Sequence, residues 1–239
     1  MLDDADVERV LVVTAHPDDV DFGAAGTVAN WTDAGIEVTY CLCTDGQAGG
    51  NDRDLPREEM ARIRRIEQTE AARAVGVTDL RFLGHMDGEL YPTHELRRDI
   101  SRVIRQVRPQ RVLTQSPERW WDRLGVSHPD HRAAGDATVD AVYPDARNPF
   151  AHPELLDVEG LEPWIVSEIW LMASPRAEHF VDVTTQFDRK IAALNAHVSQ
   201  TSHFEDMAGF VRPWMAGTAR DAGLPEGRLA ERFQVVPVG

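Results

Sequence analysis

Two short clusters of histidine and aspartate hold the side chains best suited to chemistry in this 239-residue sequence. The first reads AHPDD at residues 15–19, and the second reads SHPDH at residues 127–131. Imidazole nitrogens and carboxylate oxygens together form a donor set that zinc accepts in proteins. The two clusters therefore indicate a metal site, provided that the fold brings them together.

The spacing inside each cluster favours convergent side chains. His16 and Asp19 can face one point if a helix begins at the intervening proline, because residues three apart lie on one side of a helix. Asp18 then points elsewhere and is free for another task. The two histidines of the second cluster are also three apart, and the proline after the first of them suits an opening helical turn. Alone, either cluster is more typical of a surface helix cap than of a ligand set.

Alternating strand and helix patterns dominate the first two-thirds of the chain. The helix at 58–75 has a glycine, Gly76, placed to cap it, and an Arg-Pro pair ends the helix at 95–107. Strands separated by helices of this length predict an α/β fold, a Rossmann-like and mostly parallel sheet with helices on both faces. The predicted strands are 7–14, 36–44, 80–83 and 111–114, and the predicted helices are 26–34, 58–75 and 95–107.

The last third of the sequence has less regular patterns. Residues 144–163 are rich in proline and acid and are interpreted as a long surface loop. Strands are expected at 167–173 and 180–183, and a helix at 185–198. Because no linker or internal repeat is evident, residues 1–239 are predicted to form a single domain that is less regular from about residue 144.

A parallel sheet binds its ligands just outside the carboxyl ends of its strands. This rule selects the loops that follow Thr14, Thr44 and Thr114. The first histidine cluster lies in the first of these loops, and the third loop leads to the second cluster. The predicted topology therefore places both clusters at one edge of the sheet.

Composition excludes several classes of partner. The formal net charge of -15 argues against nucleic acid and anionic membranes, both of which need basic patches. No apolar run approaches the ~18 residues of a membrane span, and the acidic N-terminus lacks the basic start of a secretory signal. Cytoplasmic localisation is therefore expected.

Cys41 and Cys43, the only cysteines, are interpreted as buried thiols in a strand.

The motifs together resemble the PIG-L/LmbE-like deacetylase family, which includes the N-acetylglucosaminyl-inositol deacetylases of mycothiol synthesis and the related bacillithiol enzymes. The resemblance rests on A-H-P-D-D followed about 110 residues later by H-P-D-H. It is supported by Thr44-Asp45-Gly46, by Asp87-Gly88 and by KIAALNAHVSQ at 190–200. It covers most of the chain.

The resemblance implies a role for each residue of the two clusters. His16, Asp19 and His131 would bind a metal, Zn²⁺ in the first place with Fe²⁺ or Mn²⁺ as alternatives. Asp18 would be the general base, and His128 would stabilise the oxyanion or act as an acid. Three protein ligands leave a coordination position for water, whose pKa a catalytic zinc lowers to about 7. Whether Asp18 or His128 protonates the departing amine stays open.

One position departs from the family pattern. The usual motif continues with Glu, whereas this chain has Val20 and then Asp21. Asp21 is interpreted as an ordinary acid at a helix N-terminus rather than as a substitute for the missing carboxylate. His197 in the later motif is interpreted as a surface histidine.

Several loop residues have a functional and a structural interpretation. Asp45 and Asp87 suit either sugar hydroxyls or simple turns before glycine. The same ambiguity holds for a tryptophan pair, as sugar platform or loop packing, and for two arginines that could hold an anion: Trp120, Trp121, Arg53 and Arg119. The glycines at 23–26 lack the G-x-G-x-x-G order, so no dinucleotide cofactor is expected.

These observations predict a metal-dependent hydrolase, a zinc-dependent N-deacetylase that acts on a small N-acylated amino sugar or its conjugate. An amidase that acts on a thiol conjugate is a close alternative. A non-haem iron enzyme shares the two-histidine, one-carboxylate donor set, but that class is typically built on an antiparallel jelly roll. A non-catalytic binding module is a third class. The resemblance also makes a homo-oligomer plausible.

Overall fold

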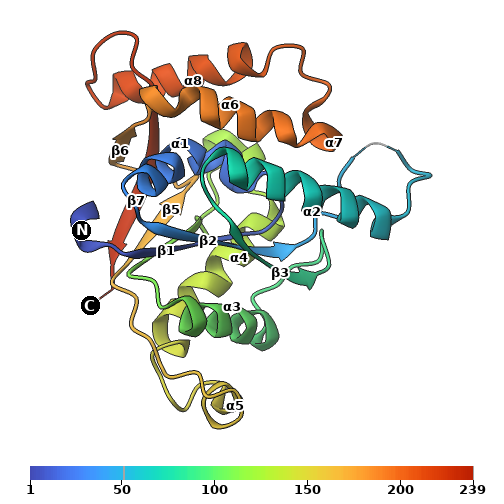
Figure 1. Cartoon of the computed structure of the whole chain (residues 1–239), viewed down its shortest axis with the longest axis vertical. Coiled ribbons are helices and arrows are strands. Elements are labelled where there is room, and N and C mark those ends of the chain that lie inside the picture. The colour runs from blue at the N-terminus through green and yellow to red at the C-terminus, as the bar shows by residue number, and fades with distance from the viewer. Residues whose placement is uncertain (51, 239) are drawn as a thin grey trace.

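The computed structural model describes residues 1–50 and 52–238, and a seven-stranded sheet runs through this part of the chain (Figure 1). The first five strands in spatial order are parallel, and the last two are antiparallel to their neighbours. The spatial order is β3 (Asp79–His85), β2 (Glu37–Thr44), β1 (Arg9–Thr14), β4 (Arg111–Gln115), β5 (Glu168–Met172), β7 (Ala230–Pro237) and β6 (His179–Asp182). The predicted mostly parallel α/β sheet is confirmed.

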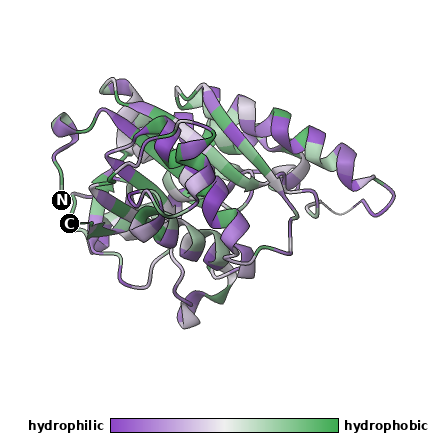
Figure 2. Cartoon of the chain, turned by 90° about the horizontal axis from the view of Figure 1, so that it is seen from below, coloured by the Kyte–Doolittle hydropathy of each residue, from purple (hydrophilic) through white to green (hydrophobic). Residues whose placement is uncertain are grey.

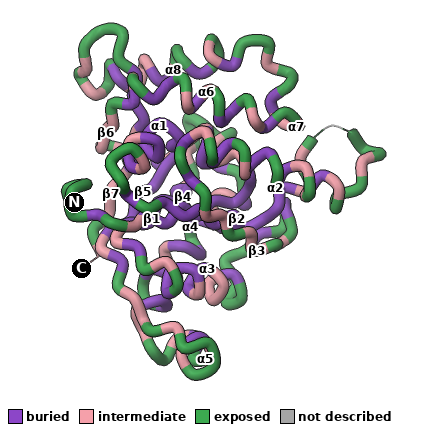
Figure 3. Tube along the Cα trace, viewed as in Figure 1, coloured by how far each residue is buried: buried purple, intermediate pink, exposed green. Residues whose placement is uncertain are grey.

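Helices cover both faces of the sheet (Figure 1), and the strands between them are largely buried (Figure 3). Two separate apolar layers lie between the helices and the sheet. One face carries α1 (Asp19–Asp33), α2 (Arg57–Ala74) and α6 (Phe187–Ala196). The opposite face carries α3 (His94–Val107) and α4 (Pro129–Asp140). The short α7 (Val198–Thr201) follows α6, and α8 (Met207–Asp221) packs against α6 and β7. Helix α5 (Pro153–Asp157) lies on an outlying loop.

The central strands are buried on both sides because helices pack on both faces of the sheet. All residues of β4 and β5 are buried, as are all but the first residue of β1 and β2. Figure 2 shows hydrophobic residues along the strands and hydrophilic residues on the peripheral loops. Cys41 and Cys43 are free and buried in β2, as predicted. No helix among the described residues is long and apolar enough to cross a membrane.

Local signals set the helix ends that position the functional loops. The side chain of Thr93 caps α3 by accepting a hydrogen bond from the backbone N–H of Leu96. Gly76 follows α2 with φ of 84°, a left-handed conformation that glycine adopts without strain. Pro129 begins α4, and His128 is its N-cap. The predicted start of α4 and end of α2 are therefore confirmed.

Most of the segment 144–163 is irregular and exposed or half-buried, as interpreted, but the structure anchors parts of it in the interior. Asp145, Ala146 and Leu155 are buried, and part of the segment is helical. Arg97 donates two hydrogen bonds to the Asp145 carboxylate, and Arg105 donates to backbone carbonyls of the segment. The composition of the segment could not predict this anchoring, because the arginines that hold the segment lie in α3, far away in the sequence.

Two further elements, α8 and β7, had no sequence prediction. Helix α8 contains two glycines and Pro213, which weaken its helical pattern. Strand β7 lies between β5 and β6 and is antiparallel to both. The alternation of strand and helix that predicts a parallel strand is therefore missing from its sequence surroundings.

Candidate metal centre and active site

The loop after β1 is held from both sides by the neighbouring strands. Thr44, the last residue of β2, donates from its backbone N–H and its hydroxyl to the carbonyl of Ala15, each at 2.9 Å. Gln115, the last residue of β4, accepts from the Ala15 N–H at 2.9 Å. The carboxyl ends of three adjacent strands therefore fix the backbone that carries the first cluster.

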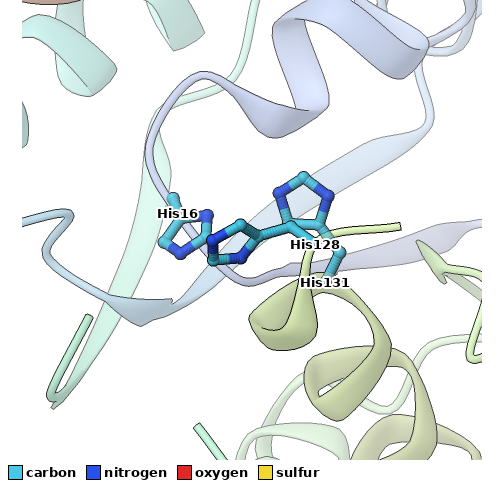
Figure 4. A group of neighbouring side chains, drawn as sticks. All are labelled: His16, His128 and His131. Carbon is cyan, nitrogen blue, oxygen red and sulfur yellow. The ribbon is translucent and has the colours of Figure 1, made fainter. Parts of the chain in front are cut away.

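The two histidine clusters meet at this edge of the sheet, as predicted (Figure 4). His16 comes from the loop after β1, while His128 and His131 come from the start of α4. Each pair of rings has its centroids 5.3 Å apart. One ligand nitrogen from each ring lies within 4.8 Å of the others, which is a spacing that suits a single metal ion.

Asp19 lies between two of the three imidazoles. Its Oδ1 is 2.9 Å from Nε2 of His131, and its Oδ2 is 3.4 Å from Nδ1 of His16. The backbone N–H of His16 also donates to Oδ2 at 2.7 Å. The three residues that the family resemblance implied as ligands are therefore in mutual contact, and His128 adjoins them.

The far nitrogen of His16 faces two further carboxylates. Its Nε2 is 3.1 Å from Asp87 and 3.2 Å from Asp130. Both carboxylates already accept backbone hydrogen bonds, Asp87 from Ala48 and Asp130 from Gly88. Carboxylates at one nitrogen of a histidine fix its tautomer and orientation, so Nδ1 is the nitrogen of His16 that faces Asp19.

The site has an excess of negative charge that a cation would balance. Burial lowers the pKa of the His16 imidazole, but Asp19, Asp130 and Asp87 outweigh this effect and raise it to about 12. Burial also lowers the pKa of His131, and the charge of Asp19 raises it above its usual value. The nitrogen and oxygen donors and the negative charge of these carboxylates both fit a divalent cation.

Asp18 takes a left-handed backbone conformation at the N-cap of α1, with φ of 87°. Its N–H donates to Gln68, and its carboxylate pairs with Arg64 at 3.1 Å. Arg64 also donates to the carbonyls of Pro17 and Gly46. Burial raises the pKa of Asp18, Arg64 opposes that effect, and the result is about 6. Such a carboxyl is suited to general base catalysis near neutral pH.

His128 has a defined hydrogen-bond role within its own loop. Its Nδ1 accepts from the backbone N–H of Asp130 at 3.2 Å, which places the proton of the neutral ring on Nε2. Burial lowers the pKa of His128, and the charges of His16 and His131 lower it further. Both effects favour the neutral form of the ring, in which Nε2 is the donor atom.

Asp21 lies in the first turn of α1, as interpreted, but it is not an ordinary helix-terminal acid, and the structure corrects the interpretation of His197 as a surface histidine. Neither is at the surface, because both side chains are fully buried and their Oδ2 and Nε2 atoms are 2.8 Å apart. Gln68 donates to the same Asp21 oxygen and accepts from Asp18 N–H. The sequence did not predict this series of hydrogen bonds, because the residues that form it come from α1, α2 and the end of α6. The only hint was the position of His197 in a family motif.

A pocket of about 820 Å³ opens above the site, and the predicted site residues line it: His16, Asp18, Asp19, His128 and His131. Asp87 and Trp120 also line it, whereas Asp45, Arg53, Arg119 and Trp121 are outside the set of lining residues. Asp45 is instead paired with Arg65 by two hydrogen bonds of 2.8 Å, and Trp121 is 77% exposed. The functional interpretation is therefore favoured for Asp87 and Trp120 alone among the ambiguous residues.

Comparison with known proteins identifies the class to which this fold and site belong. Residues 11–142 match the sequence profile of the PIG-L family, described as GlcNAc-PI de-N-acetylase. The match covers more than half of the chain, and both histidine clusters lie within it. The chain belongs to the PIG-L family.

Individual relatives extend the similarity to nearly the whole chain. Diacetylchitobiose deacetylase from Thermococcus kodakarensis is 35% identical over 97% of this chain and 84% of its own length. A probable N-acetyl-alpha-D-glucosaminyl L-malate deacetylase 2 from Bacillus cereus is 37% identical over 81% of this chain and 84% of its own length. The solved structure of N,N'-diacetylchitobiose deacetylase from Pyrococcus horikoshii superposes with a TM-score of 0.88 at 32% identity, covering 98% and 85% of the two chains.

Proposed function

We propose that this protein is a metal-dependent amide hydrolase that removes the N-acetyl group from an amino sugar or its conjugate. The observation that carries the proposal is the convergence of His16, Asp19 and His131 with Asp18 in the wall of one pocket. Two of the relatives described above are named as deacetylases of N-acetylated sugars, which supports the same reaction class.

His16, Asp19 and His131 are the proposed metal ligands, with zinc as the first candidate and Fe²⁺ or Mn²⁺ as alternatives. When bound there, a divalent ion supplies Lewis acidity that lowers the pKa of a water and polarises a carbonyl. Asp87 and Asp130 hold the His16 ring by its other nitrogen, so they are proposed positioning residues.

Asp18 is the proposed general base. Its carboxylate accepts a proton from the attacking water as the water adds to the acetamide carbon. Arg64 restricts this carboxylate on one side, and Gln68 fixes the backbone that carries it. The tetrahedral intermediate then expels the amine, and the protonated Asp18 returns its proton to the amine nitrogen. The net change is addition of one water across the amide C–N bond, which gives acetate and a free amino sugar.

His128 is the proposed donor to the oxyanion. Its Nδ1 is occupied by the N–H of Asp130, so Nε2–H is the atom available to the substrate. The lowered pKa of the ring suits hydrogen-bond donation rather than proton delivery. This assignment leaves delivery of the amine proton to Asp18.

Acetate release tests the proposal directly. The zinc-loaded protein would be incubated with N,N'-diacetylchitobiose, N-acetylglucosaminyl malate and an N-acetylcysteine conjugate of an amino sugar, and acetate would be measured enzymatically. We expect acetate from at least one N-acetylated sugar, abolished by removal of the metal and restored by its return.

Matched variants separate the site from general effects on the loops. Asp18→Asn removes the proposed base, whereas Asp45→Asn alters a carboxylate of a neighbouring loop that is paired with Arg65 outside the pocket. Acetate release should be lost in the first variant and kept in the second. Cleavage of the thiol conjugate at an amide other than the acetamide would favour the amidase alternative. Absence of acetate from every sugar would contradict the proposal.

A further inference from the structure

Two arginines lie against one tryptophan in the wall of the pocket. Arg123 belongs to the helical turn at Trp121–Val126, and Arg232 belongs to β7. Their guanidinium carbons are 5.1 Å and 4.9 Å from the centre of the Trp120 ring. All three residues line the pocket that holds the candidate metal centre.

The tryptophan is fixed in place, so the pair has a defined platform. The backbone N–H of Trp120 donates to the Ser127 hydroxyl at 2.8 Å, next to His128 in the sequence. The backbone N–H of Arg123 donates to the Trp120 carbonyl at 3.2 Å. The loop that carries the platform therefore leads directly into the second histidine cluster.

The positive charge of this pair is poorly balanced by the protein. Within the described residues, the Arg123 guanidinium has neither an ion-pair partner nor a hydrogen bond, and it lies over the Trp120 ring. Arg232 has one distant partner, Asp221 at 3.8 Å. Burial lowers the pKa of Arg123, and the charge of Arg232 lowers it further. Two neighbouring guanidinium groups repel each other, and a bound oxyanion would offset this repulsion. Paired arginines commonly bind oxyanions in this way.

The acidic groups of the pocket are not available to balance these arginines. Each carboxylate that lines the pocket already pairs with a basic side chain in the described part of the chain: Asp18 with Arg64, Asp19 with His16 and His131, Asp87 with His16, and Glu231 with Lys190. In a chain of net charge -15, this leaves the wall around Trp120 as a positive patch inside the pocket.

We propose that Arg123 and Arg232 form an oxyanion-binding subsite, and that the natural substrate carries a carboxylate or phosphate on the part beyond its N-acetylated sugar. The inference rests on the proposed deacetylase function and narrows its substrate class to anionic conjugates. Arg53 and Arg119, the two arginines that the sequence also offers for an anion, do not line the pocket.

Kinetics on two substrates that differ only in charge test the subsite. N-acetylglucosaminyl L-malate and its dimethyl ester would be compared as substrates of the zinc-loaded wild type, Arg123→Gln and Arg232→Gln. We expect the ratio of kcat/KM for acid over ester to fall roughly 10- to 100-fold in each variant, mainly through KM, because a charge-assisted hydrogen bond is lost. Added salt should lower the same ratio in the wild type.

Arg119→Gln is the matched control, because this arginine stacks on Trp121 in the same loop but outside the pocket. Its ratio should equal that of the wild type, and melting temperature and zinc content would verify that each variant is folded. Inhibition by L-malate and by inorganic phosphate then separates the two oxyanion classes, since the stronger inhibitor identifies the group. An unchanged ratio in both arginine variants would overturn the subsite.

Direct binding separates failure of the subsite from failure of the proposed function. If the wild type deacetylates neither substrate, the proposed function fails, and L-malate binding to the zinc-loaded protein is measured by calorimetry. Weaker binding in Arg123→Gln and Arg232→Gln would still support the subsite. Equal binding in all variants would place the carboxylate on the metal alone and contradict it.

Discussion

Asp18 is the residue whose chemistry depends most on its surroundings. Its backbone is left-handed, its carboxylate is paired with Arg64, and its N–H is held by Gln68. A side chain in a sparsely populated backbone conformation persists when its neighbours fix it, and such residues gather at functional sites. Asp18 therefore has the constraint expected of a base that must meet a water in one orientation.

Replacement of this carboxylate gives the first prediction. Asp18→Asn keeps the shape of the side chain but removes the proton acceptor, so we expect kcat to fall about 10²- to 10⁴-fold while KM changes little. Steady-state acetate release measures both constants, and zinc content shows that the ligands are intact. A loss confined to KM would instead make Asp18 a substrate-binding residue.

The pH dependence of the same residue gives the second prediction. Burial raises the pKa of Asp18 to about 6, and activity requires the deprotonated form, so kcat/KM should decrease as the pH falls through this value. A bound cation favours the carboxylate and moves the midpoint downward, which places it at or below about pH 6. A profile of kcat/KM at constant metal content measures it. A midpoint above pH 7 would exclude Asp18 as the titrating base.

At the scale of elements, α4 positions two of the three histidines and packs closely against the sheet. A Cβ atom added at Gly135 would lie 2.1 Å from the backbone carbonyl oxygen of Gln115, the last residue of β4. The helix can approach the strand only because this position has no side chain. The distance between the two histidine clusters therefore depends on one glycine outside the site.

The third prediction follows from this contact. Gly135→Ala should push α4 away from β4, destabilise the fold by about 1–3 kcal/mol and weaken metal binding. Gly217→Ala in α8 is the matched control, because the nearest atom to its added Cβ is the end of the Arg220 side chain at 3.7 Å. Urea unfolding and zinc titration measure the two effects. Unchanged zinc affinity in Gly135→Ala would mean that the clusters tolerate a shift of α4.

Helix α1 is tied to the C-terminal part of the chain by a buried ion pair. Lys190 and Glu231 are fully buried and 2.8 Å apart. Lys190 also donates to the carbonyls of Asp21 and Phe22, and Glu231 accepts from the N–H groups of Gly26 and Thr27. The pair therefore fixes the helix that begins at Asp19.

The fourth prediction concerns this pair. Lys190→Met leaves the Glu231 charge buried without a cation, which should cost about 3–5 kcal/mol of unfolding free energy. The double variant Lys190→Met/Glu231→Gln removes the charge and keeps an acceptor for Thr27, so it should recover part of the loss. Chemical denaturation compares the two. Equal stability of the single and double variants would show that the buried charge is not the cause.

The elements that the sequence predicted well are those with strong local signals. The four parallel strands up to β4 and the helices between them follow from apolar runs and caps, and their carboxyl ends located the site. The contacts of Asp87 and Asp130 with His16, and of Asp21 with His197, were beyond prediction because each joins residues from different elements that only the fold brings together. Helix α8 and strand β7 were missed because proline and glycine in the helix and an antiparallel partner for the strand weaken the local patterns.

At the scale of the whole molecule, the sheet topology explains why the site is where it is. Strands β2, β1 and β4 are parallel neighbours, so the loops after them share one edge, and α4 returns to that edge beside them. The mostly parallel sheet also disfavours the iron-oxygenase alternative, which was tied to an antiparallel jelly roll. Homo-oligomer formation stays a prediction.

If His16, Asp19 and His131 bind a catalytic metal, the metal content of the purified protein must depend on these side chains. Elemental mass spectrometry would compare purified wild type, His131→Ala and the control His94→Ala, whose histidine is exposed at the start of α3 outside the pocket. We expect about one zinc, iron or manganese per chain in the wild type and in His94→Ala, and loss of the metal in His131→Ala. No metal in the reconstituted wild type, or full retention in His131→Ala, would contradict it.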